Sequence, residues 1–195
     1  MPRRPAEANV EKLQPAQDVV HERASLRRVF GAFATGVTVV TVGGEIAHGM
    51  TANSFTAVSL DPPLILVCVG RDALMHEVME QQPAFAVSIL AADQTALARY
   101  FADKRRPVGR DQFNAVSWSP GAHSGAPLID GSLAHLECEL EQRHEAGDHT
   151  IYVGRVLSLW RRPGDDALLF LNGQFLRTDD QPEPVPAQPG STDAP

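Results

Sequence analysis

The residues best suited to chemistry in this sequence are its histidines and two cysteines, and their spacing favours neither a metal site nor a nucleophile. None of the seven histidines stands at ligand spacing from another histidine or from a cysteine. No GxSxG turn is present to activate a serine, and Cys68 and Cys138 lie in apolar segments, where thiols act as small hydrophobes. The sequence therefore predicts no metal and favours binding and positioning chemistry.

Nucleotide-binding loops are also missing from the sequence. Neither GxGxxG nor GxxxxGK[ST] occurs, although dinucleotide folds and nucleotide triphosphatases require such a glycine-rich turn between a strand and a helix. A nucleotide or flavin, if bound, must therefore lie on something other than a doubly wound sheet.

The most unusual segment is residues 49–59, which looks like a strand with small polar residues on both faces. Polarity alone fits a solvated edge strand. The alternative is a strand that lines a ligand. Hydroxyl and amide groups of Thr51, Asn53 and Ser54 can hydrogen-bond a flat heterocycle, and Ala52 leaves room for its ring. Both interpretations stay open on the residues alone.

Composition restricts the class of protein around this segment. The chain has 195 residues, 43% of them hydrophobic, with a net charge of -7. This fits one globular domain with tails. Lys and Arg do not cluster densely, which argues against nucleic acid or an anionic membrane as partner. The N-terminus has no apolar h-region and no run of 18 apolar residues occurs, so we expect a cytoplasmic protein.

Three regions are predicted along the chain. Residues 1–24 form an N-terminal extension whose charges sum to zero. Residues 25–178 form the folded domain. Residues 179–195 hold five of the fifteen prolines and four acids without a base, which is typical of a disordered tail.

The periodicities within the domain favour a mainly β protein. Leu26, Val29, Phe30 and Phe33 share one face of an amphipathic helix that we expect to end at Gly36. The other expected elements are a hairpin whose turn has both Gly43 and Gly44 at positive φ, strands at 64–69 and 85–90, a helix over 73–81 capped by Asp72, and a helix over 93–101. A loop follows, then a strand over 136–141 with apolar and acidic faces, its partner over 150–160, and a last strand or strand pair over 167–176. Six or more sequential antiparallel strands with helices set aside predict an α+β fold, a closed barrel with peripheral helices.

Several motifs taken together resemble one known family. They are FATGVTVVT at 33–41, GMTANSFTAVSLDPPL at 49–64, DQF at 111–113, GAPL at 125–128, GSLA at 131–134, and GDHTI at 147–151 with Gly154. In order and spacing they closely resemble the flavin reductase-like family, the small reductase components of two-component flavin-dependent monooxygenases. The match covers residues 26–178.

The resemblance implies a Greek-key split β-barrel of the FMN-binding type, forming a homodimer with flavin near the subunit interface. It also implies a set of cofactor-binding residues: Gly36 and Val37 beside the ring; Thr51, Ala52, Asn53 and Ser54 on the ring and ribityl chain; Cys68 and Arg71 towards the ribityl and phosphate; and Gly147, Asp148, His149 and Thr150, with His149 orienting nicotinamide. For Cys68, core packing is an equal alternative, and any flavin contact would use its backbone. Arg71 near a helix start makes a sensible anion site.

Two functions from different classes follow from the resemblance. One is an NAD(P)H:flavin oxidoreductase that transfers a hydride from NADH or NADPH to FMN or FAD and supplies reduced flavin to a partner monooxygenase. The other is a non-catalytic flavin- or haem-binding carrier. His149 in its GDHT context favours the enzyme, because a carrier needs no nicotinamide site. Ala73 and Met75 stand where many members carry hydroxyls, which leaves the choice between FMN and FAD open.

Overall fold

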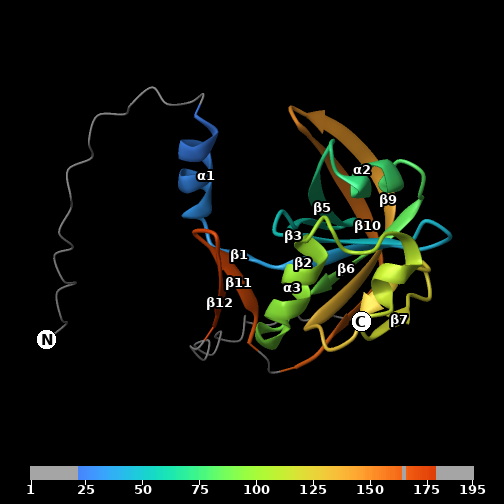
Figure 1. The fold of residues 1–195 in the computed structure, drawn as a ribbon. Helices are drawn as coiled ribbons and strands as arrows, with labels where there is room; N and C mark the ends of the chain where they lie inside the picture. Colours follow the sequence, from blue (N-terminus) through green and yellow to red (C-terminus); the bar gives the residue numbers. More distant parts are fainter. Residues whose placement is uncertain (1–21, 164–165, 179–195) are drawn as a thin grey trace, which may run out of the picture.

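A curved, seven-stranded antiparallel sheet organises the computed structural model, which describes residues 22–163 and 166–178 (Figure 1). Its strands are β2 (Thr38–Val42), β3 (His48–Ala52), β4 (Thr56–Leu60), β5 (Pro63–Gly70), β6 (Ala84–Ile89), β9 (Ala134–Ala146) and β10 (His149–Arg161). Their order in the sheet is β3-β2-β6-β9-β10-β5-β4. This arrangement confirms the expected split-barrel class.

The two edges of this sheet are consecutive in the chain. β3 and β4 lie at opposite ends of the strand order, yet only residues 53–55 connect them. Three residues span little more than 10 Å, so the sheet must curl until its edges approach each other. Ser54 holds the connection, since its hydroxyl donates to the Cys68 carbonyl (2.9 Å) and accepts from the Cys68 N–H (3.0 Å). We call this meeting of the two edges, residues 51–56, the seam.

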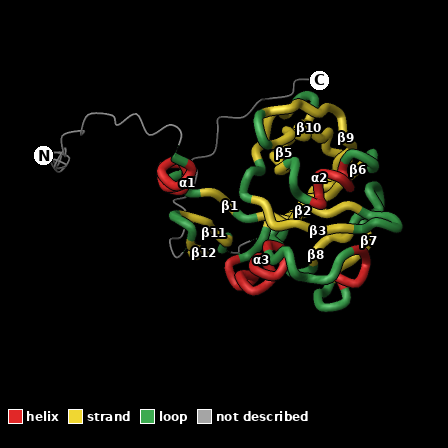
Figure 2. The backbone as a smooth tube through the Cα atoms, turned by 45° about the horizontal axis from the view of Figure 1, so that its top comes forward, coloured by secondary structure: helices red, strands yellow, loops and turns green. Residues whose placement is uncertain are grey.

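The remaining elements lie around the barrel, as Figure 2 shows. β1 (Thr35–Gly36), β11 (Leu168–Leu171) and β12 (Gln174–Arg177) form a three-stranded sheet, and β7 (Trp118–Pro120) pairs with β8 (Pro127–Ile129). The helices are α1 (Arg23–Gly31), α2 (Leu74–Met79) and α3 (Thr95–Ala102), with 3-10 turns η1 (Ala92–Gln94) and η2 (Gly109–Phe113). β7, β8 and η2 lie within the segment that was expected to be a loop.

Apolar residues form cores on both faces of β2. Val40 and Val42 pack into the cluster inside the barrel with Phe85 and Tyr152. Val39 instead joins a second cluster, beneath α3, that contains Phe101 and Phe113. All five residues of β2 are buried, which explains its continuous β-branched sequence.

The first helix differs from its expected form. It ends at Gly31 rather than Gly36, because residues 35–36 are extended as β1 and pair with β11. The Asn172 N–H also donates to the Gly31 carbonyl (2.7 Å). No residue of α1 is buried, so its apolar stripe faces away from the described core. The helix stands apart from the barrel in Figures 1 and 2.

Three local expectations were also wrong. Residues 49–59 form not one strand but both edge strands of the sheet, β3 and β4. In the hairpin turn only Gly44 has a positive φ (83°), whereas a side chain at Gly43 would overlap the Gly125 carbonyl. Helix α2 begins at Leu74 without a side-chain cap, because its N-cap residue is Ala73 rather than Asp72, whose carboxylate lies 3.6 Å from Lys104 Nζ.

The remaining helix and strand expectations agree with the structure within a few residues. The N-terminal extension is described only for residues 22–24, and the tail at 179–195 lies outside the described residues. The three-region division therefore stays a prediction. Within the described ranges, no helix has the length and apolar character needed to cross a membrane.

Glu137 departs from the expected acidic outer face of β9, because its side chain is only 4% exposed. Its Oε2 accepts from the Ser124 N–H (2.7 Å), the Ser124 hydroxyl (2.8 Å) and the His123 N–H (2.9 Å), and Oε1 accepts from the Ser158 hydroxyl (2.9 Å). Burial alone would raise the pKa of this carboxyl, but the four hydrogen bonds outweigh it and lower the pKa to about 2. Glu137 thus fixes the turn before β8 onto the sheet.

Replacing Glu137 with glutamine should destabilise the fold at neutral pH by roughly 3 kcal/mol, because four donors lose a charged acceptor. The native pKa is depressed from 4.5, so this contribution is complete above about pH 4.5 and disappears as the pH falls towards 2. Denaturant unfolding of wild type and Glu137→Gln at about pH 7 and about pH 3 measures the difference. Glu139→Gln, exposed on the same strand, is the control. A difference that does not shrink at low pH would contradict this account.

Candidate functional site

The predicted site residues are joined by a chain of direct contacts around the seam. Thr38, which follows Gly36 and Val37, pairs with Ala52. Ser54 bonds the backbone of Cys68, as described above. Gly70 of β5 pairs with His149 of β10, and the Arg71 N–H donates to the Asp148 carbonyl (3.0 Å). Four segments distant in sequence therefore meet at one end of the barrel.

The edge of β3 offers main-chain groups to a ligand. Gly49 points its N–H and carbonyl away from β2, where the Gln112 side chain accepts from the N–H (3.0 Å) and Arg106 donates to the carbonyl. Because outward-pointing residues alternate in an antiparallel ladder, the main-chain groups of Thr51 point the same way. Donors and acceptors on an open strand edge can bind a flat heterocycle in its own plane.

The hydroxyl groups expected to contact the ring are used within the protein. Thr51 donates to the Ala98 carbonyl of α3 (2.7 Å), and Thr38 donates to the Ala52 carbonyl (2.8 Å). Ser54 makes both of its bonds to Cys68. Contacts from this segment to a ligand would therefore come mainly from the main chain and from Asn53. The hydroxyls hold the strand in place.

Gly36 and Val37 border the same end of the barrel in different ways. Gly36 is exposed, and a Cβ added there would meet no atom within 4 Å. The Val37 side chain is buried in the second core and its carbonyl accepts from the Leu90 N–H (2.9 Å), so a ligand contact from Val37 is limited to its N–H. Open space beside Gly36 leaves room for a ring above the barrel end.

The turn between β9 and β10 carries His149. Gly147 has a φ of 64°, which explains glycine there, and His149 Nδ1 lies 2.8 Å from Asp148 Oδ1. The hydrogen bond from His149 lowers the pKa of the Asp148 carboxyl. This contact fixes Nδ1 and leaves Nε2 free to face Gly70, whose added Cβ would lie 3.7 Å from it. Thr150 is buried instead, with its hydroxyl 3.0 Å from His76 Nε2.

Arg71 and Cys68 occupy the end of β5 next to this turn. The Arg71 guanidinium pairs with Glu145 of β9 at 3.4 Å, and both side chains are largely exposed. Such a pair is weak, so an anion can replace the carboxylate at little cost. Cys68 is half-buried, and its burial raises the pKa of the thiol. Its thiol is therefore protonated, which fits packing and a backbone role.

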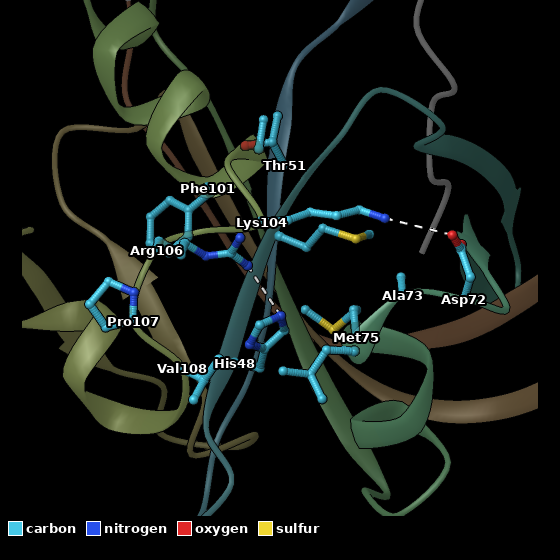
Figure 3. A pocket seen from close by; sticks show the side chains of 13 residues that line it. His48, Thr51, Asp72, Ala73, Met75, Phe101, Lys104, Arg106, Pro107 and Val108 are labelled. Atoms are coloured by element: carbon cyan, nitrogen blue, oxygen red, sulfur yellow. Dashed lines mark hydrogen bonds and ion pairs between the residues drawn. The ribbon is translucent and has the colours of Figure 1, made fainter.

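A cavity of about 420 Å³ adjoins the seam, and sequence reasoning missed it (Figure 3). It lies between β3, the start of α2 and the chain after α3, and Thr51 is its one predicted site residue. Its polar wall holds His48 and Arg106, whose Nη2 lies 3.1 Å from His48 Nε2. Burial and the neighbouring guanidinium lower the pKa of His48 to about 4. The only sequence signal for this cavity is the basic run Lys104–Arg105–Arg106.

No group of three or more His, Cys, Asp or Glu side chains that could hold a metal ion occurs in residues 22–163 and 166–178. The groups that remain for a ligand around the seam are main-chain amides, the Asn53 side chain, the His149 imidazole and the Arg71 guanidinium. These groups fit an aromatic heterocycle with anionic substituents.

Comparisons with known proteins agree with this chemistry. The family model described as a flavin reductase like domain matches residues 30–179. An NADH-dependent FAD reductase from Streptomyces globisporus is 57% identical over 156 residues, which cover 80% of this chain and 86% of that protein. The flavin-dependent monooxygenase reductase subunit HsaB from Rhodococcus jostii is 36% identical over 162 residues, covering 82% of this chain and 80% of that one.

Solved structures of flavin reductases also resemble this chain. The NADH:FAD oxidoreductase SgcE6 of Streptomyces globisporus C-1027, in complex with NAD and FAD fragments, has a TM-score of 0.77 at 55% identity over 80% of this chain and 93% of that chain. BorF, the flavin reductase component of a bacterial two-component tryptophan halogenase, has a TM-score of 0.78 at 53% identity over 81% of this chain and 99% of its own.

Proposed function

This chain belongs to the family of flavin reductase like domains, and from that premise we propose that it is an NADH-dependent flavin reductase. It transfers a hydride from NADH to FMN or FAD and supplies the reduced flavin to a partner flavin-dependent monooxygenase. The observation that carries the proposal is the open edge of β3 at the seam, with His149 on the neighbouring strand pair. The carrier alternative has no support among relatives named as NADH-dependent reductases.

The residues present fit a flavin. The outward main-chain groups of Thr51 offer in-plane hydrogen bonds, and the open space at Gly36 accommodates a ring. Bound flavin supplies the hydride-accepting ring, and no protein acid or base is required at the moment of transfer. The chain's own contribution is positioning: the seam fixes one ring, and His149 orients the other from the β9–β10 turn.

We assign the flavin phosphate to Arg71, whose main chain contacts the β9–β10 turn. Its N–H is already held by Asp148, while its guanidinium makes only the exposed pair with Glu145. A phosphate can therefore take the place of that carboxylate. We also propose a cytoplasmic location, because both cysteines are free thiols and the reaction consumes NADH.

The proposed activity is tested by following NADH absorbance with the purified protein. Oxidation should require added flavin and saturate with FMN or FAD, because the flavin is a substrate that leaves reduced. The ratio of kcat/KM for the two flavins then identifies the preferred one. NADH oxidation that never rises on addition of either flavin, in a protein that still binds flavin, would reinstate the carrier.

His149→Ala should raise the KM for NADH by about tenfold and change the KM for flavin less than threefold, because the imidazole orients only the nicotinamide. The measurement is steady-state kinetics with each substrate varied in turn. His144→Ala, an exposed histidine on β9, is the matched control. Equal changes in both KM values would remove His149 from the nicotinamide site.

A homodimer is the assembly we propose, and the apolar face of α1 supports it. Val29 and Phe30 of α1 are 70% and 69% exposed, and Phe33, two residues after the helix ends, is 76% exposed. Exposed apolar surface of this kind on a helix that stands off the barrel needs a partner. A second copy of the chain, presenting the same stripe and barrel, is that partner.

Phe30→Glu should weaken self-association by at least about tenfold, because it places a charge in an apolar contact. Sedimentation velocity over a range of concentrations measures the change. Arg28→Gln alters the charge by the same amount on the opposite side of α1 and serves as the control. A wild-type protein that sediments as a monomer throughout would refute the dimer.

A further inference from the structure

Helix α2 is tied by polar contacts to β10, the strand that begins with His149. The helix lies within the ring of barrel strands in Figure 2, and its buried face packs into the cluster inside the barrel. Two of its polar side chains face β10. His76 Nε2 lies 3.0 Å from the Thr150 hydroxyl, and Glu80 Oε1 accepts from the Tyr152 hydroxyl (2.8 Å). Because these β10 residues are two apart, α2 holds one face of the strand.

The contact between His76 and Thr150 is the one next to the site. Successive residues of a strand face opposite sides, so Thr150 points into the barrel, whereas the side chain of His149 is half exposed. Thr150 is only 3% exposed, so its hydroxyl depends on partners within the protein. The His76 ring packs edge-on against Tyr152, with 5.9 Å between the centroids, which restricts its orientation. Thr150 is thereby held from inside the barrel.

The β9–β10 turn is held on two sides by one short segment, residues 71–76. At the start of this segment, the Arg71 N–H donates to the Asp148 carbonyl (3.0 Å). At its end, His76 contacts Thr150 from the first turn of α2. Arg71 is also the residue that we assign to the flavin phosphate. The segment therefore fixes the nicotinamide turn relative to the flavin.

We propose that His76 is a positioning residue for hydride transfer, which acts through Thr150 to hold the β9–β10 turn so that His149 keeps the nicotinamide over the flavin ring. The reacting atoms must lie about 3–3.5 Å apart, so a small displacement of the turn reduces productive binding of NADH. The inference rests on the proposed reductase function and on the proposed role of His149. It assigns a role to a histidine that none of the sequence motifs contains.

His76→Phe is the direct test, because it keeps a ring against Tyr152 and removes both nitrogens. It should raise the KM for NADH by about fivefold and change the KM for flavin by less than about twofold. Thr150→Val is the second variant. It breaks the same contact from β10 with a smaller change in shape, and it should show the same difference between the two KM values. Steady-state kinetics with each substrate varied in turn measure both.

Tyr152→Phe is the matched control. It removes the other hydrogen bond between α2 and β10 and leaves the contact between His76 and Thr150 in place. Both substitutions remove one polar contact between the same two elements, so a purely structural role predicts the same kinetics for the two variants. A positioning role predicts that Tyr152→Phe lowers the melting temperature but leaves the KM for NADH as in the wild type.

A double-mutant cycle shows whether His76 acts through His149. If it does, His76→Phe raises the KM for NADH by less than about twofold in a protein that already carries His149→Ala, because the orientation is already lost. Two effects that multiply in full would overturn the proposal, as would a Tyr152→Phe variant that behaves like His76→Phe.

The proposal is also overturned if the folded variants His76→Phe and Thr150→Val leave the KM for NADH unchanged, or raise both KM values equally. It falls as well if His149→Ala has no effect on the KM for NADH. Flavin-dependent NADH oxidation by the wild type is measured in the same assays and survives each of these outcomes. Its absence would instead refute the reductase function itself.

Discussion

The short link between β3 and β4 is the constraint on which the arrangement of the molecule depends. Backbone hydrogen bonding joins seven strands into one sheet, and the link makes its two edges neighbours without letting them pair. The barrel is therefore closed by the covalent chain and by the two Ser54–Cys68 bonds rather than by a ladder. An unpaired strand edge is usually a hazard, because it can pair with another chain. Here it lies at the end of the barrel where the predicted site residues meet.

The edge of β3 is divided into two parts by what covers it. Towards its start, Gln112 and Arg106 satisfy the outward groups of Gly49, so this part is structural and rigid. From Thr51 onward the edge is open. Of Thr51 itself, only the side-chain hydroxyl is hydrogen-bonded, to the Ala98 carbonyl. The same loop that covers the first part brings Arg106 into the cavity. β3 therefore has one part that is covered by the protein and one part that is open to a ligand, and Thr51 lies at the boundary between them.

Sequence patterns predicted the strands well, because alternation and β-branched runs report burial directly, as at β2 and the apolar side of β9. They failed where contacts between residues distant in sequence determine the local structure. The end of α1 depends on pairing between β1 and β11, and the burial of Glu137 depends on a turn brought from residues 123–124. The motif-based site residues do meet at the seam, but the role of Ser54 as a clamp and the position of Arg106 required the fold.

The strength of the polar contacts differs systematically between scaffold and site. Glu137 and Arg106 are held by several partly or fully buried hydrogen bonds, whereas Arg71–Glu145 and Lys104–Asp72 are single exposed pairs. Each exposed pair contributes less than about 1 kcal/mol, so exchanging its carboxylate for a phosphate costs little in either direction. A reductase that hands its flavin to another enzyme must release it after each turnover. The rigid main-chain and guanidinium groups can orient the flavin. The exposed cations can exchange a carboxylate for a phosphate and back again, which allows release.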